Sequence, residues 1–240
     1  MPNNYFQFKQ FTVQQDRCAM KVTTDGCLFG GYIAERITDY RLQIANCLDI
    51  GAGTGLLSLM LAQKSTAIID AVEIDEAAYS QAKENFDQSP WKERLNIYNT
   101  DILTFSSDKK YDCIITNPPF FEDDLRSSDV NKNNAKHDTA LTLKQLLQVI
   151  DLHLKEDGIF FILLPFHRAG YFEKEAALLN FYPAEKLNVR QTPTHDHFRT
   201  ILSFSRKEII VTNGELIIRD ADNQYTTEFS ALLKDYYLFL

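Results

Sequence analysis

Residues 48–55 read Leu-Asp-Ile-Gly-Ala-Gly-Thr-Gly, and a helix-like apolar run, residues 56–62, follows them directly. A short apolar strand, a glycine-rich turn and a helix start form the opening unit of a nucleotide-binding α/β sheet. The pattern is D-x-G-x-G-x-G and not the dinucleotide pattern G-x-G-x-x-G, because neither Gly51 nor Gly53 is followed by a glycine five residues later. The compact turn therefore predicts a nucleotide site without a cradle for a pyrophosphate.

Acidic residues lie at the ends of three consecutive predicted strands: Asp49, Glu73 and Asp101. Glu73 comes about twenty residues after the glycines, where an acid can accept hydrogen bonds from both ribose hydroxyls, and Asp101 suits an adenine amino group. A cationic ligand with a ribose and an adenine fits this set, and S-adenosylmethionine is such a ligand. The alternative is that strand-end acids cap the following helices. We assign that role to Asp75, which opens the helical run 76–83.

The sequence Asn117-Pro118-Pro119-Phe120 follows the apolar run 111–116. Proline cannot continue a central strand, and the residue before it is held extended, so the strand ends in a rigid corner. This corner carries an amide, a proline carbonyl and an aromatic face, which suit a planar aromatic amine. We expect Asn117 and the Pro118 carbonyl to accept the two amino hydrogens. Phe120 and Phe121 compete for the stacking role, and position in the motif favours Phe120.

Apolar and helical stretches alternate along the chain. Strands are expected at 47–51, 67–74, 95–100, 111–116, 159–164, 184–191 and 198–205, with helices between most of them. This alternation predicts a doubly wound, mainly parallel α/β sheet with ligands at its carboxyl edge. We expect one domain over residues 1–240, in which 1–37 form a hairpin and helix cover, 38–207 the catalytic core and 208–240 a hairpin and helix appendage.

The order of these motifs resembles the class I S-adenosylmethionine-dependent amino-methyltransferases. More narrowly, nearly the whole chain resembles the bacterial tRNA1(Val) adenine-N6 methyltransferase family, which modifies the adenosine just 3′ of the anticodon of a valine tRNA. The narrower likeness is carried by residues 8–13, 18–26, 136–138 and 225–237.

The resemblance implies a Rossmann-like fold with seven strands, the last antiparallel, and methyl transfer to the N6 of a tRNA adenosine. It assigns catalysis to Asn117, Pro118, Pro119 and Phe120. It also implies that residues near 21–25 close over the methionine part of S-adenosylmethionine. The expected cofactor-binding residues are Lys21, Thr24, Asp25, Asp49, Gly51, Gly53, Gly55, Glu73, Asp101 and Asn117. For Lys21, Thr24 and Asp25, a helix cap with a solvated lysine is the alternative.

Composition limits the other possibilities. The chain has 240 residues, of which 45% are hydrophobic, and its four cysteines show no metal-ligand spacing. These features predict a cytoplasmic enzyme with reduced thiols, no metal and no membrane segment. We expect a monomer.

The formal net charge of −8 offers no general attraction to phosphates. One stretch, residues 186–207, holds five cations and a single acid, Asp196; the cations are Lys186, Arg190, Arg199, Arg206 and Lys207. This stretch is either a local phosphate footprint for tRNA, extended by Arg126, Lys132 and Lys136, or a set of ordinary surface charges. His137 either touches the target nucleotide or is a solvent-exposed loop residue.

Three other functions use a similar corner or fold. A protein-glutamine N5-methyltransferase of release factors would present its substrate amide to the same corner, but the first 35 residues are too few for a separate helical bundle. A DNA adenine methyltransferase is a further alternative, but no target-recognition domain is evident in the 240 residues. A binding module without turnover would have no need for the Asn-Pro-Pro corner.

Overall fold

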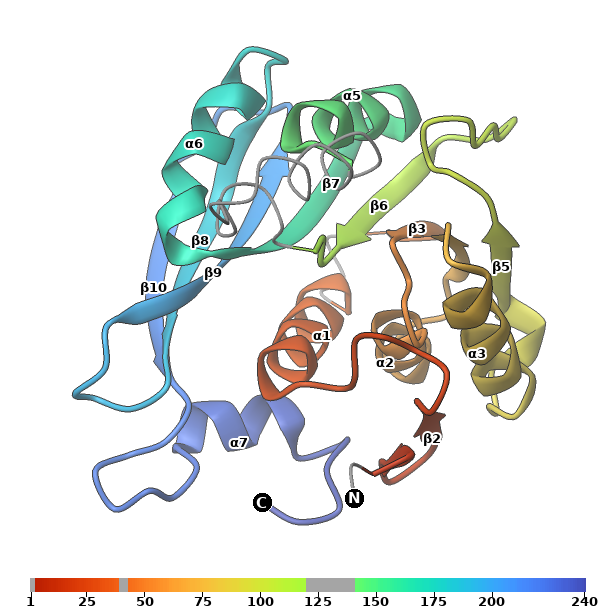
Figure 1. Ribbon diagram of the computed structural model, residues 1–240. Helices are drawn as coiled ribbons and strands as arrows, with labels where there is room; N and C mark the ends of the chain where they lie inside the picture. Colours follow the sequence, from red (N-terminus) through yellow and green to blue (C-terminus); the bar gives the residue numbers. More distant parts are fainter. Residues whose placement is uncertain (1–2, 39–42, 120–140) are drawn as a thin grey trace, which may run out of the picture.

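The computed structural model describes residues 3–38, 43–119 and 141–240, which form one large sheet with helices on both faces (Figure 1). In chain order the strands of the sheet are β3 (Asn46–Ile50), β4 (Ile68–Glu73), β5 (Leu95–Asn99), β6 (Tyr111–Thr116), β7 (Leu154–Pro165), β8 (Tyr182–Arg190), β9 (His197–Ser205) and β10 (Thr212–Ile217). The helices are α1 (Thr24–Ile37), α2 (Leu56–Lys64), α3 (Glu76–Asp87), α5 (Leu143–His153), α6 (Phe166–Ala177) and α7 (Thr227–Leu233), with a 3₁₀ turn η1 (Lys92–Arg94). No helix within these described ranges is long and apolar enough to cross a membrane.

The sheet has the order β10-β8-β9-β7-β6-β3-β4-β5. Strand β9 runs antiparallel to β7 and β8, and the other pairings are parallel. The predicted fold class is therefore confirmed, including the antiparallel strand. The sheet has eight strands where seven were expected, because β10 pairs in parallel with β8 and covers the edge that β8 would otherwise expose. The hairpin expected after residue 208 is reduced to an isolated bridge between Arg219 and Tyr225.

Both faces of the central strands are buried, which explains their nearly continuous apolar sequences. In β6, Cys113 and Ile115 join the core that contains α1 and α2, whereas Ile114 joins the core that contains α5 and α6. In Figure 1, α1, α2, α3 and α7 lie below the sheet, and α5 and α6 lie above it. All four cysteines are buried free thiols.

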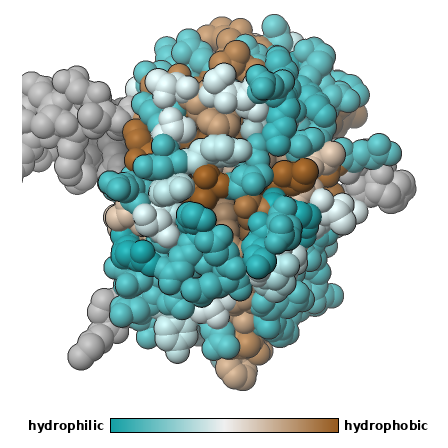
Figure 2. Space-filling view, turned by 90° about the vertical axis from the view of Figure 1, so that its right-hand side faces the viewer, coloured by the Kyte–Doolittle hydropathy of each residue, from teal (hydrophilic) through white to brown (hydrophobic). Residues whose placement is uncertain are grey.

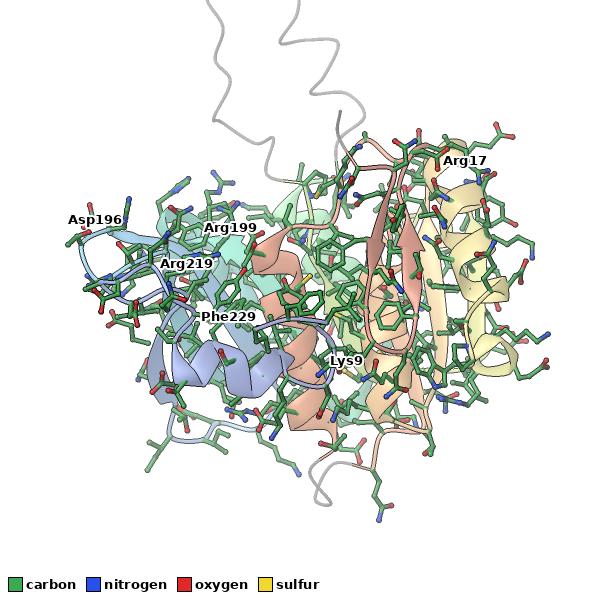
Figure 3. All side chains as sticks on the ribbon, turned by 90° about the horizontal axis from the view of Figure 1, so that it is seen from below. Lys9, Arg17, Asp196, Arg199, Arg219 and Phe229 are labelled. Carbon is green, nitrogen blue, oxygen red and sulfur yellow. The ribbon has the colours of Figure 1, made fainter. Side chains whose placement is uncertain are left out.

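A small separate sheet pairs β1 (Tyr5–Gln7) with β2 (Thr12–Gln14), as the predicted hairpin near the start of the chain requires. The segment after α7 packs against it: Phe8 forms a β-bridge with Tyr237, and the Lys9 N–H donates to the Tyr236 carbonyl at 2.8 Å. Lys9 and Phe229 are both visible on this side of the molecule in Figure 3. The two segments thus hold each other below α1 and α2.

Candidate active site

The glycine turn joins the carboxyl ends of β3 and β4. The backbone N–H groups of Gly51 and Ala52 donate to the Val72 carbonyl at 2.9 and 3.1 Å. Gly53 has a φ of 55°, a conformation that a side chain makes costly. A Cβ added at Gly53 would have nothing within 4 Å. The turn therefore presents bare backbone to open space, as a ligand that contacts the backbone requires.

Gly55 has a packing reason for its identity. Its φ is 80°, and a Cβ placed there would lie 2.5 Å from Cε1 of Phe86 in α3. The absence of a side chain lets α2 begin directly against α3. Gly55 was predicted as a cofactor residue, and the structure brings it to the turn while giving it this separate structural task.

Glu73 ties the glycine turn to the end of β4. Its Oε2 accepts a hydrogen bond from the Gly53 N–H at 2.8 Å, and its Oε1 accepts one from the Asp75 N–H at 2.9 Å. Each carboxylate oxygen keeps a further lone pair for another donor. The side chain of Asp75 accepts from the Ala78 N–H at 2.8 Å, so its predicted role as the cap of α3 is confirmed.

Asp49 is fully buried beneath the turn. Its Oδ2 accepts from the Ser58 hydroxyl at 2.7 Å, and its Oδ1 has no hydrogen-bond partner among the described residues. Burial raises the pKa of the Asp49 carboxyl to about 7, against the hydrogen bonds from Ser58 that lower it. A buried carboxylate with one unpaired oxygen is a place for a donor that the protein itself does not supply.

Asp101 lies just beyond the end of β5, and its Oδ1 accepts from the Leu103 N–H at 2.9 Å. Sequence reasoning missed two apolar neighbours of the strand-end acids. Ile74 follows Glu73 and is 63% exposed, and Leu103 is 48% exposed. The edge of the molecule at β5 and α3 is mainly hydrophilic (Figure 2), and exposed aliphatic side chains follow the ends of β4 and β5. The signal in the sequence is an aliphatic residue one or two positions after each acid.

The Asn-Pro-Pro corner lies beside the glycine turn. Thr116, the last residue of β6, pairs in register with Ile50, the last residue of β3. The Thr116 hydroxyl also donates to the Ile50 carbonyl at 2.9 Å. Asn117 and Gly51 are therefore the next residues of two adjacent strands, which are spaced about 4.8 Å apart.

Asn117 has a buried oxygen, Oδ1, with no hydrogen-bond partner in the described part of the chain. Pro118 is buried and Pro119 is exposed. Phe120, Phe121 and His137 lie outside the described residues, so the predictions for these three stay predictions.

The start of α1 lies close to the turn, because a Cβ added at Gly26 would lie 3.6 Å from the Leu56 side chain. The cap of α1 is Thr23, and Thr24, the first residue of the helix, is exposed. Asp25 is engaged within the protein, since its Oδ2 accepts from Arg199 Nε of β9 at 2.8 Å. The ammonium of Lys21 lies 3.3 Å from the carbonyl of Asn3.

The cation-rich stretch 186–207 carries little unpaired charge. Four of its five cations pair with carboxylates: Lys186 with Glu173, Arg190 with Glu215, Arg199 with Asp25, and Arg206 with Asp151. Asp196 lies at the tip of the β8–β9 loop, away from Arg199 (Figure 3). These pairs favour the alternative of ordinary surface charges over a phosphate footprint. Arg126, Lys132 and Lys136, its suggested extension, lie outside the described residues. The part of the chain that the structure describes holds no group of three or more His, Cys, Asp or Glu side chains suited to a metal ion.

Comparison with known proteins agrees with this geometry. The family model "Methyltransferase small domain" matches residues 34–167. A tRNA1(Val) (adenine(37)-N6)-methyltransferase of Dyadobacter fermentans is 43% identical over 99% of both chains. One of the same name from Bacteroides thetaiotaomicron is 41% identical over 100% of both chains.

Among solved structures, a predicted O-methyltransferase of Agrobacterium tumefaciens matches with a TM-score of 0.68. The match covers 88% of this chain and 95% of that chain at 13% identity. At this identity the likeness shows the fold alone.

Proposed function

The chain belongs to the tRNA1(Val) (adenine(37)-N6)-methyltransferase family, and from this premise we propose that its Asn-Pro-Pro corner presents the N6 amino group of a tRNA adenosine for methylation. S-adenosylmethionine is the methyl donor. The observation that carries the proposal is the pairing of Thr116 with Ile50, because it brings the amine-accepting corner beside the glycine turn.

The described residues fit this cofactor. Open space at Gly51 and Gly53 admits a ligand against the backbone, and the unpaired Asp49 Oδ1 can accept from a donor within the turn. Glu73 would accept from the ribose hydroxyls, and Asp101 from the adenine amino group. When bound, S-adenosylmethionine supplies a methyl group on a sulfonium, which becomes a neutral thioether as the methyl leaves.

Asn117 orients the nucleophile. The lone pair of an adenine N6 is delocalised into the ring, so the free amine is a weak nucleophile. When the Asn117 Oδ1 and the Pro118 carbonyl accept the two amino hydrogens, the lone pair is directed toward the methyl group. The nitrogen becomes acidic only as its bond to the methyl forms, and it then loses a proton to water. Positioning is thus the main contribution, and it can supply roughly 7–11 kcal/mol of a barrier.

We further propose adenosine 37 of tRNA1(Val) as the target, following the names of the relatives. The enzyme would act as a cytoplasmic monomer of one domain, divided into the cover, core and appendage given above. Lys21, Thr24 and Asp25 would close over the methionine part of the cofactor, and Phe120 would stack on the target base.

The test is incubation of the protein with methyl-labelled S-adenosylmethionine and separate pools of tRNA, rRNA, DNA and release factor. We expect label in tRNA, recovered as N6-methyladenosine after nuclease digestion and mass spectrometry, and none with an Asn117→Ala variant. Label in a glutamine of the release factor would instead support the protein methyltransferase.

A further inference from the structure

Two aromatic rings form a partly exposed pair one strand away from the corner. Phe166 begins α6 and is 40% exposed, and His197 begins β9. Their ring centroids lie 4.9 Å apart with an interplanar angle of 34°. The Phe166 side chain is not part of the core, because the buried side chains of α6 are Ala169, Phe172 and Ala176.

The imidazole of the pair is held by polar contacts from two further strands. His197 Nε2 lies 2.6 Å from Glu215 Oε1, and Arg190 Nε donates to the same oxygen at 2.9 Å. Glu215 belongs to β10 and Arg190 ends β8, so the imidazole is fixed from the side away from Phe166. A surface that is already ordered loses little conformational entropy when a ligand covers it.

The sheet puts the pair on the substrate side of the corner. Thr116 of β6 pairs with Ile162 of β7, so Phe166 starts one strand away from Asn117 and roughly 10 Å further along the strand direction. The glycine turn and the strand-end acids occupy the opposite side, over β3, β4 and β5. The rest of the target molecule must therefore approach over β7 and β9. Because Phe166 is offset from Asn117 along the strand, its ring and that of His197 lie to one side of the base that reaches Asn117. They do not enclose that base.

We propose that Phe166 and His197 stack on the base of an RNA nucleotide that neighbours the target adenosine. The inference rests on the proposed function, because it takes the target to be a single-stranded RNA segment. Turning the target base out of its strand leaves the neighbouring base without a stacking partner. An aromatic platform replaces that partner, and such stacking is sequence-tolerant because every base has a flat face.

The test uses Phe166→Ala and Phe166→Trp with an anticodon stem–loop of a valine tRNA that carries 2-aminopurine next to the target adenosine. Stacking on an aromatic ring quenches 2-aminopurine fluorescence. We expect quenching with the wild type and the Trp variant, and its loss with the Ala variant. The KM for RNA should rise about tenfold in Phe166→Ala, while the Kd for S-adenosylmethionine stays unchanged.

Leu178→Ala is the matched control, since Leu178 lies just after the other end of α6 and is 76% exposed. It should leave the KM and the quenching as in the wild type. His197→Ala, which removes the second ring, should lose part of the quenching and serves as a second variant if Phe166→Ala fails to fold; quenching as in the wild type would then overturn the inference.

An unchanged KM and unchanged quenching in Phe166→Ala would overturn the inference. That result would leave the proposed function intact as long as the wild type methylates the stem–loop. Absence of RNA methylation by the wild type would instead remove the proposed function itself. Loss of cofactor affinity in Phe166→Ala equal to the loss for RNA would also overturn the inference, because it would mean a general structural role.

Discussion

The two halves of the carboxyl edge of the sheet differ in what their polar groups contact. Over β3 and β4, the acids are largely tied into the protein: both carboxylate oxygens of Glu73 accept from backbone N–H groups, and Asp49 Oδ2 accepts from Ser58, which leaves Asp49 Oδ1 without a partner among the described residues. Over β6 and β7, Asn117 Oδ1 has no partner among the described residues, and Phe166 faces outward. A small cofactor that is the same in every turnover suits a prearranged site. A large target that brings its own structure suits an edge with unsatisfied groups.

The largest effect should come from the half over β6 and β7, which contains Asn117. Asn117→Ala should lower turnover by roughly 10²–10³-fold, the range seen when one aligned hydrogen-bonding group is removed from an active site. The Kd for S-adenosylmethionine should change by less than about threefold, because each half of the edge works separately. Steady-state kinetics and calorimetric titration measure the two quantities. An equal loss of turnover and of affinity for S-adenosylmethionine would mean that Asn117 serves both ligands, and it would contradict its assignment to the target.

In the half over β3 and β4, the pH dependence of the free energy of unfolding tests the burial of the Asp49 carboxyl. The pKa of this carboxyl is about 7 in the native state, above its ordinary value of 3.8. Between about pH 4 and 7 the native state therefore holds a proton that the unfolded chain has released, so this group makes the free energy of unfolding decrease as the pH rises. Asp49→Asn removes the effect. The wild type should lose roughly 2–4 kcal/mol more than the variant across this window, measured by urea unfolding without cofactor.

Asp112→Asn is a control of opposite sign. Burial raises the pKa of Asp112, but the hydrogen bonds from Lys155 and from the Asn46 and Ala45 N–H groups outweigh burial and lower it. Its stabilisation is present above about pH 4 and is lost as the pH falls through the lowered pKa. The variant should therefore be less stable than the wild type at neutral pH and approach it in acid. The same pH trend in both variants would contradict the assignment for Asp49.

Gly53→Ala should weaken the cofactor site without unfolding the protein. The left-handed conformation costs an alanine roughly 1–2 kcal/mol, and its methyl group would enter the open space before the turn. We expect the Kd for S-adenosylmethionine to rise about tenfold. Gly170→Ala is the control: it lies in α6 with nothing within 4 Å of an added Cβ, so cofactor binding should not change. An unaltered Kd in Gly53→Ala would mean that the cofactor does not approach this backbone.

The smallest effect should come from the ion pair that ties the start of α1 to β9, outside both halves. Asp25→Asn breaks the ion pair with Arg199, which joins the start of α1 to β9. Both side chains are partly exposed, so the free energy of unfolding should fall by at most about 1 kcal/mol. Because α1 is proposed to close over the cofactor, the Kd of the Asp25→Asn variant for S-adenosylmethionine should still rise a few-fold. Glu35→Gln on the same helix, whose contact with Arg36 is 3.8 Å long, is the control.

The sequence predicted most of what local backbone chemistry determines. The glycine turn, the Asp75 cap and the end of β6 at the prolines were readable, because glycine and proline restrict the backbone wherever they occur. The partner of Asp25 was not readable, since Arg199 is remote in sequence. The same limit explains why the sequence left two interpretations open for the cations of residues 186–207: their carboxylate partners come from other elements.

The edge of the sheet was also beyond local reasoning. The parallel pairing of β10 with β8 depends on a crossover connection, and nothing within residues 212–217 distinguishes it from a hairpin strand. The aromatic pair of Phe166 and His197 is brought together only by the pairing of β7 with β9. Composition alone would have counted either residue as an ordinary surface group.

The contact between Phe8 and Tyr237 has a consequence for how the enzyme is made. During synthesis, β1 and β2 emerge from the ribosome early, but Tyr237, which bridges to Phe8 between them, is among the last residues to be translated. Nascent chains that have already formed β3 to β9 can dock β2 on α3 through Gln14 and Asn85, but Phe8 lacks its bridge to Tyr237 until the end of the chain is made. The rate at which the last codons are translated, more than the folding of the sheet, then determines how long the apolar surface at Phe8 stays exposed.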